Sequence, residues 1–356
     1  MLETPTFQVP TVDIGAYVDP AGSGAGRQAA ARAFDEAART VGFVQVLGHG
    51  IPDDVLAAFA GALDAFFALP LETKKAYRTP PEINRGYTAP RTESLSLSLG
   101  LASADRRHDF FEAFNVGAAT SDYPGVDLPV TDYAENVWPA EPLVPDFRAA
   151  VSAYFAHAAR VARTLTALFA DALALPAGFF APFTDHSLDV LRMNNYALPP
   201  GEQLDGVDHT GMGAHTDYGI VTVLWADRVA GLQVLDRAGG WHDVVPAEGA
   251  LLINLGDLMA RWTDDRWLST LHRVVPPVVE GRVERRRSTA FFHDGNVDAV
   301  IETLPPCRAA DGTSSYPPIT VGGHIRAKLA GSRAGVANPE AEREAARVLA
   351  ARGTRA

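Results

Sequence analysis

The sequence predicts a mainly β protein with flanking helices, in which antiparallel strands form a sandwich or a barrel. Two observations predict this class. From residue 187 onward, short runs of β-branched and aromatic residues alternate with glycine-containing turns, a spacing typical of sandwiches and barrels. Before that residue, apolar side chains recur at helical intervals, so helices are expected to surround the strands.

The N-terminal region is expected to combine short strands with three helices. Residues 6–14 and 43–47 are predicted to be strands. The predicted helices share high alanine content or apolar residues at helical spacing, and they are residues 27–41, 52–69 and 71–77. Gly42 follows the first of them, as glycine commonly follows the last turn of a helix.

A loop rich in proline and aspartate, residues 118–145, precedes the longest predicted helix, residues 146–175. The apolar stripe of this helix would brace the strands from outside. The strands that follow are predicted at residues 188–196, 220–225, 231–235, 241–245, 250–253, 271–275 and 288–293. Residues 236–240 supply the glycines of a hairpin connection, and a charged helix is expected over residues 338–352.

Composition restricts the partners and the compartment. The chain has 356 residues and a formal net charge of −12, so neither nucleic acid nor an anionic membrane surface is expected to bind. No apolar run approaches the ~20 residues of a membrane helix. The first residues have neither a charged n-region nor an apolar h-region, so secretion is not expected. The lone Cys307 excludes an intramolecular disulfide and fits the cytoplasm. The choice between monomer and homo-oligomer stays open.

Three residues have the pattern of a metal site. His215 and Asp217 are two positions apart in a strand-like segment, so their side chains would project from one face. His272 follows at the end of another strand-like run and can supply the third ligand. Two histidines and one carboxylate that leave coordination positions open are typical of non-haem Fe(II) oxygenases.

A second pair predicts a carboxylate site. Arg286 and Ser288 are also two positions apart on a predicted strand. A guanidinium beside a hydroxyl can bind a carboxylate through paired hydrogen bonds. Phe291 and Phe292 would exclude water from the site.

The ordered set of motifs resembles the isopenicillin N synthase-like members of the Fe(II)/2-oxoglutarate-dependent oxygenases. The resemblance extends over roughly residues 8–330. Besides the segments above, it is carried by Pro-Thr-Val-Asp-Ile at residues 10–14, Gly-Phe-Val-Gln-Val-Leu-Gly-His-Gly-Ile at 42–51, Phe-Phe-Ala-Leu-Pro at 66–70, Leu-Arg-Met-Asn-Asn-Tyr at 191–196 and Tyr-Pro-Pro-Ile at 316–319.

The resemblance implies a double-stranded β-helix (jelly roll or cupin-like) core at residues 187–330. It also implies an N-terminal oxygenase region at 1–117, a loop and bracing helix at 118–186, and a C-terminal helix at 331–356. No linker divides these regions into independent domains. The strand at 109–117 would border the mouth of the active site.

The implied cofactors are Fe(II), 2-oxoglutarate and O2. Iron would be bound by His215, Asp217 and His272. The distal carboxylate of 2-oxoglutarate would pair with Arg286 and Ser288, with Tyr196 and Asn194 nearby. The reaction would release succinate and CO2 while a small molecule is hydroxylated, desaturated or cyclised, in secondary-metabolite biosynthesis.

Two alternatives remain open from the residues. One is an oxidase of the same fold that uses no 2-oxoglutarate, because an Arg-x-Ser pair indicates carboxylate binding without identifying the carboxylate. The other is a non-catalytic sensor of iron or a ligand. Outside the site, His49 and His293 are expected to be structural, and His209 could line the cleft. Asn254 and Asp257 are assigned to a turn, and Trp225 and Trp262 to the core or the cleft wall.

Overall fold

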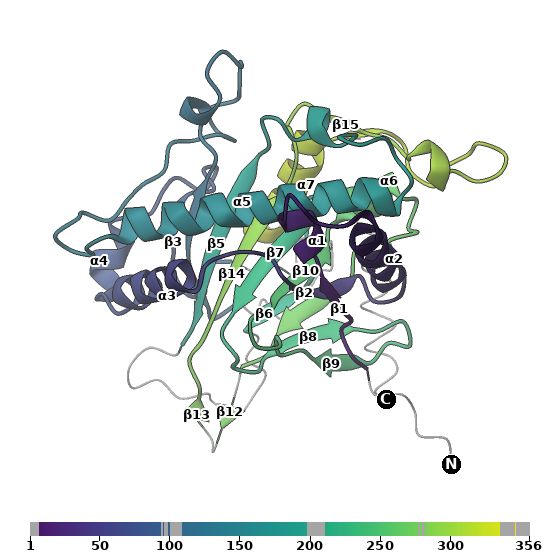
Figure 1. Cartoon of the computed structure of the whole chain (residues 1–356). Helices are drawn as coiled ribbons and strands as arrows, with labels where there is room; N and C mark the ends of the chain where they lie inside the picture. The colour runs from purple at the N-terminus through teal and green to yellow at the C-terminus, as the bar shows by residue number, and fades with distance from the viewer. Residues whose placement is uncertain are drawn as a thin grey trace.

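Two β-sheets form the centre of the protein, and helices cover one of them (Figure 1). The structure is a computed structural model that describes residues 7–93, 95, 99, 109–197, 211–276, 278–279, 282–334 and 346. The alternating serines and leucines at 94–99 lie largely outside these residues, and so does nearly all of the predicted helix at 338–352.

The larger sheet has eight strands in the order β1-β2-β10-β7-β14-β5-β4-β3. Its strands are β1 (Thr11–Asp13), β2 (Phe43–Leu47), β3 (Gly86–Thr88), β4 (Glu112–Gly117), β5 (Asp189–Tyr196), β7 (Val221–Ala226), β10 (Leu251–Leu255) and β14 (Arg286–His293). Only β1 and β2 pair in parallel; every other pairing in this sheet is antiparallel. The sheet therefore joins strands from the N-terminal region to strands of the predicted core.

The smaller sheet has four strands in the order β6-β11-β8-β9. They are β6 (Met212–His215), β8 (Leu232–Leu235), β9 (Trp241–Asp243) and β11 (His272–Val274). Gly239 and Gly240 lie in the turn between β8 and β9, as predicted, and Gly239 has φ +87°. Two further pairs, β12 (Val278–Val279) with β13 (Arg282–Val283) and β15 (Val300–Ile301) with β16 (Ile319–Thr320), lie outside both sheets.

Alternation along β5 and β14 gives the larger sheet two different faces. One face, which includes Leu191, Met193 and Phe291, is fully buried in the main apolar core. The long helix α5 (Phe147–Ala172) packs on this face, where Phe155 meets the Phe291 ring edge-on at 5.1 Å between centroids. The other face is turned toward a cleft between the two sheets, and its side chains are largely polar.

The helices are α1 (Gly15–Val18), α2 (Gly24–Thr40), α3 (Asp53–Phe67), α4 (Leu71–Lys75), α5, α6 (Asp257–Trp262) and α7 (Val321–Ala334). Short 3-10 turns lie at Thr120–Asp122, Ala181–Phe183 and Pro305–Cys307. In Figure 1, α5 runs across the strands, and both α2 and α3 contact it. The predicted long helix thus packs against the strands from one side.

The structure corrects the expected role of Phe291 and contains one helix that the sequence did not predict. Phe291 does not help to exclude water from the site, because it is on the α5 side of β14, whereas Phe292 lines the cleft. Helix α7 was not expected, because glycines at 322 and 323 weaken its helical pattern. Tertiary contacts made by its buried residues, such as Val321 and Ile325, outweigh that weak propensity.

Candidate metal centre and carboxylate site

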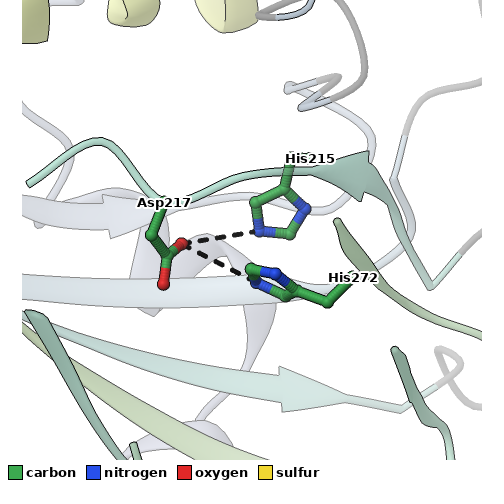
Figure 2. A group of neighbouring side chains, drawn as sticks. All are labelled: His215, Asp217 and His272. Atoms are coloured by element: carbon green, nitrogen blue, oxygen red, sulfur yellow. Dashed lines mark ion pairs between the residues drawn. The ribbon is translucent and has the colours of Figure 1, made fainter. Parts of the chain in front are cut away.

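Strand pairing brings the three predicted metal ligands together. In the smaller sheet, β11 pairs with β6 so that His272 lies directly opposite His215, and Asp217 follows β6 by two residues. One donor atom from each residue lies within 4.8 Å of the other two. The Asp217 Oδ1 atom is 3.9 Å from His215 Nε2 and 3.7 Å from His272 Nε2, and Figure 2 shows all three side chains converging.

Hydrogen bonds turn the donor atoms toward a common centre. The Nδ1 atoms of His215 and His272 lie 2.7 Å and 3.0 Å from the carbonyl oxygens of Gly213 and Thr270. A carbonyl only accepts, so each Nδ1 carries a proton, and each Nε2 is the nitrogen left to face the centre of the triad. Such partners of a ligating histidine fix both the tautomer and the orientation of the ring.

The second oxygen of Asp217 is held by the larger sheet. Its Oδ2 accepts hydrogen bonds of 2.6 Å from Thr222 Oγ1 on β7 and from Asn254 Nδ2 on β10. These bonds leave Oδ1 as the atom that faces the histidines. The carboxylate is thus oriented with one oxygen toward the two imidazoles.

Burial affects the charge state of His215. All three residues of the triad are less than 9% exposed. Burial, with a smaller contribution from the neighbouring His272, lowers the pKa of His215 well below its ordinary value. The imidazole is therefore neutral at physiological pH, and neutral imidazole is the form that binds a metal.

The predicted carboxylate anchors lie on two adjacent strands of the larger sheet. In the antiparallel pair β14–β5, Arg286 lies opposite Tyr196 and Ser288 lies opposite Asn194. The Arg286 guanidinium carbon is 5.2 Å from the centroid of the Tyr196 ring. Arg286 is 1% exposed, and its Nε and Nη1 atoms have no hydrogen-bond partner among the residues that the structure describes.

One cleft contains both groups. The triad, Arg286, Ser288, Tyr196 and Asn194 all line it, and its empty volume is about 1040 Å³, including space that is open to solvent. Phe43 of β2 and Leu232 of β8 line it from the two sheets. The structure therefore brings together all seven residues that the sequence predicted for the site.

The residues present fit the implied cofactors. Two imidazole nitrogens and one carboxylate oxygen on one side of a common centre suit Fe(II) and leave positions for a second ligand. A buried guanidinium without a full set of partners is costly, because an unpaired charge in a protein interior keeps its desolvation penalty. An anionic ligand in the cleft would supply the missing partner of Arg286.

Several other predictions have clear outcomes. His49 is structural: its Nε2 lies 3.1 Å from the Gly249 carbonyl oxygen, and its Nδ1 accepts from the Ile51 N–H. His293 lies outside the cleft, with its Nδ1 2.8 Å from Asp189 Oδ1. Trp262 is buried in the core, and Trp225 is partly buried against it. His209 lies outside the described residues.

The assignment of Asn254 and Asp257 to a turn is wrong. Asn254 lies within strand β10, where it contacts the metal-ligand candidate Asp217, and Asp257 is the first residue of α6. A signal was present in the sequence, because Asn254 is the one polar residue in the apolar run Leu-Leu-Ile-Asn-Leu at residues 251–255. A buried polar residue in such a run needs a hydrogen-bond partner, and here the partner is Asp217.

Two family descriptions match successive parts of the chain. The N-terminal domain of "non-haem dioxygenase in morphine synthesis" matches residues 9–141. The "2OG-Fe(II) oxygenase superfamily" matches residues 188–295, which contain the triad, Arg286 and Ser288. The chain belongs to the Fe(II)- and 2-oxoglutarate-dependent oxygenases. The recognition made from the motifs is confirmed.

Relatives of this oxygenase support the same membership along most of its length. It is 36% identical over 288 residues to the 2-oxoglutarate-Fe(II) type oxidoreductase hxnY of Emericella nidulans, with 80% of this chain and 79% of that protein covered. It is 34% identical over 333 residues to validamycin A dioxygenase of Streptomyces hygroscopicus subsp. limoneus, with 91% and 86% covered.

Solved structures confirm the jelly-roll core. A putative 2OG-Fe(II) oxygenase family protein of Caulobacter crescentus aligns with a TM-score of 0.76 at 30% identity, over 91% of this chain and 99% of that one. A full-length protein of Neurospora crassa, solved in complex with alpha-KG and thymine, also aligns with a TM-score of 0.76, at 29% identity over 90% of this chain and 96% of that one.

This oxygenase is accordingly a non-haem Fe(II) enzyme that uses 2-oxoglutarate as co-substrate and oxidises a small molecule. The prediction of an enzyme with these cofactors is confirmed. Among its described helices, none combines the length and the apolar character needed to cross a membrane.

Replacing Asn254 with Leu should weaken Fe(II) binding about tenfold, because the Asp217 carboxylate loses a hydrogen bond that orients it. The dissociation constant can be measured by anaerobic competition with a chelator. Thr289→Val is a matched control, since Thr289 is buried on β14 and its hydroxyl has no described partner. Equal affinities in the two variants would contradict the orienting role of Asn254.

Proposed function

We propose that His215, Asp217 and His272 bind Fe(II), and that Arg286 and Ser288 bind the distal carboxylate of 2-oxoglutarate. The observation that carries the proposal is the buried guanidinium of Arg286, which lacks described partners at two of its nitrogens and lines the same cleft as the triad. Tyr196 and Asn194, opposite these residues on β5, complete the co-substrate site.

Each protein group then has a defined task. Asp217 Oδ1 and the two Nε2 atoms hold the metal on one side, because their other polar atoms are already engaged in hydrogen bonds. Arg286 neutralises the co-substrate carboxylate, and Ser288 can donate a hydrogen bond to it. Apolar side chains such as Phe43 and Leu232 line the cleft and would limit the access of water to the bound ligands. When bound, Fe(II) couples the oxidative decarboxylation of 2-oxoglutarate by O2 to the oxidation of a substrate C–H bond.

The primary substrate is proposed to contact a polar wall of the cleft formed by Asn84, Glu93, Asn115 and Arg192. Arg192 lies opposite Asn115 in the β5–β4 pair, and its Nη2 is 2.5 Å from Glu93 Oε2. The Asn115 side-chain amide donates to Asn84 Oδ1 at 2.8 Å, while its own Oδ1 has no described partner. Because the charges of Arg192 and Glu93 offset each other, the wall favours a neutral group that both donates and accepts hydrogen bonds.

Oxidation of a natural product is the role that relatives support. Validamycin A dioxygenase and clavatol oxidase of Penicillium crustosum are named for such compounds. We infer hydroxylation, desaturation or cyclisation of a small secondary metabolite in the cytoplasm. The alternative of an oxidase that uses no 2-oxoglutarate is not supported, because the matching family model and the relative hxnY are both named for 2-oxoglutarate. A non-catalytic sensor would bind iron through the same three residues but would not turn over a substrate.

Anaerobic titration of the Fe(II)-loaded protein with 2-oxoglutarate tests the proposal directly. A metal-to-ligand charge-transfer band in the visible range should appear and saturate at one equivalent per chain, because the keto acid chelates the iron. Asp217→Ala should remove both iron binding and the band. Iron binding without any band would refute chelation of the iron by 2-oxoglutarate at this site, and absent iron binding would reject the metal assignment.

Arg286→Ala should raise the dissociation constant of 2-oxoglutarate at least about 30-fold, because loss of one partner of a buried charged pair costs about 2 kcal/mol or more. Iron affinity should stay unchanged. Arg287→Ala is the matched control: its side chain lies on the other face of β14 and pairs with Asp64 at 2.8 Å. An unchanged co-substrate affinity in Arg286→Ala would refute the anchor.

A substrate screen based on succinate release should identify neutral, hydrogen-bonding compounds. With the best of them, the double variant Glu93→Gln/Arg192→Met should raise KM about tenfold or more, because hydrogen bonds to charged groups contribute about 1.5–3 kcal/mol. Both charges are removed together so that neither is left unpaired. Because Arg192 Nε also donates to Asn194 Oδ1 at 3.3 Å, the affinity for 2-oxoglutarate is measured in parallel, and Arg148→Met on the exposed side of α5 serves as control. An unchanged KM would show that Glu93 and Arg192 do not contact the substrate.

A further inference from the structure

One face of helix α7 reaches both the cleft and the segment that carries two of the metal-ligand candidates. Ile325, Leu329 and Ser332 of this helix line the cleft. Between them lies Lys328, which is only 2% exposed. Lysine is rarely buried this completely without a partner, so the groups around its ammonium identify its role.

The Lys328 ammonium lies between two side chains near the triad. Its Nζ is 2.7 Å from Asp257 Oδ2 and 3.2 Å from Thr216 Oγ1. It also lies 5.5 Å from the centroid of the Tyr218 ring. Thr216 separates His215 from Asp217 and is fully buried, so Lys328 contacts the residue between the two ligands.

Asp257 connects this segment to the third ligand. Its Oδ2 accepts a hydrogen bond from Thr216 Oγ1 at 3.2 Å, and its Oδ1 accepts one from Ser269 Oγ at 2.7 Å. Ser269 precedes His272 by three residues. The backbone N–H of Asp257 donates to the Asp217 carbonyl oxygen at 2.9 Å. A single carboxylate at the start of α6 therefore ties together both chain segments that supply the ligands.

The lysine and this carboxylate form a buried ion pair, with Lys328 2% exposed and Asp257 5% exposed. His324, one turn earlier on α7, has its Nε2 3.5 Å from the same Oδ2. An ionised carboxylate accepts several hydrogen bonds at once, and charge-assisted bonds are the stronger kind.

We propose that Lys328 and Asp257 form a positioning pair for the metal centre, which holds the Thr216 segment and the Ser269 segment at the spacing that the three ligands require. Neither residue touches the metal. Helix α7 thereby carries both residues that line the cleft and the lysine that helps to position the metal-ligand candidates. The expected effect on Fe(II) affinity rests on the proposed function. The effect on the order of the two segments does not, because it can be measured in the metal-free protein.

The first test is amide hydrogen exchange in the metal-free protein. Lys328→Met removes the ammonium and keeps most of the side-chain volume, so exchange at residues 213–218 and 256–258 should become at least about fivefold faster. Arg326→Met is the matched control on the same helix, because its side chain is 57% exposed and pairs with Asp132 at the surface. Unchanged exchange at these segments in Lys328→Met would overturn the proposal, whether or not the protein binds iron.

The second test is anaerobic Fe(II) binding, measured well below the unfolding temperature of each variant. Lys328→Met should weaken binding about tenfold, as does loss of other groups that orient metal ligands, and Arg326→Met should not change it. A variant that melts earlier but binds Fe(II) as wild type does would show a purely structural role and reject the pair as a positioning device.

Lys328→Met leaves Asp257 as an unpaired charge in the interior, which is costly and could prevent folding. Thr216→Val keeps the proposal testable in that case. This change removes only the hydroxyl that joins Asp257 and Lys328 to the ligand segment. It should accelerate exchange at residues 213–218 and weaken iron binding several-fold. If Thr216→Val matches wild type in both measurements, the proposal fails. If wild type itself binds no iron, the proposed function fails, and the exchange result still decides the positioning role.

Discussion

The pairing of β11 with β6 is the constraint on which the site depends. It sets His272 directly opposite His215 across the smaller sheet, so the two imidazoles approach each other although they are 57 positions apart along the chain (272 − 215 = 57). A slip of one residue would turn either ring to the opposite face of the sheet. Asp217 then completes the group only because the segment after β6 runs to the larger sheet, where Thr222 and Asn254 hold its second oxygen.

The cleft concentrates polar groups at a place where burial makes them costly. A histidine held neutral, a carboxylate oxygen turned toward the centre of the triad and a guanidinium with two nitrogens that lack described partners all lie in one cleft. Such an arrangement is less stable than a core of matched apolar residues. The same arrangement is preorganised for a cation beside an anion, since the protein groups need little rearrangement when the ligands arrive.

Stability is supplied on the other side of the larger sheet. Leu191, Met193 and Phe291 face α5, and the Phe59 ring of α3 stacks on Tyr154 of α5 at 4.1 Å between centroids. This apolar layer keeps β5 and β14 in register, and their register places Arg286 opposite Tyr196 and Ser288 opposite Asn194. Helices α6 and α7 contact the site more directly. Their residues Asp257 and Lys328 pair with each other, and Lys328 hydrogen-bonds Thr216 in the segment between two metal-ligand candidates.

The sequence by itself determined the candidate donor set, the candidate carboxylate anchor, the family and the order of most strands and helices. Most of these features are local: residues two apart on a strand share a face, and helical periodicity is visible within a few turns. His272 and the family were predicted instead from the ordered set of motifs along the chain. Only the tertiary structure decided which side chains orient the ligands. Asn254 and Asp257 contact Asp217 and Thr216 across 37 and 41 positions of the chain, and Lys328 reaches Thr216 across 112. No local pattern encodes such contacts, because they arise from the packing of elements whose relative positions the whole fold sets.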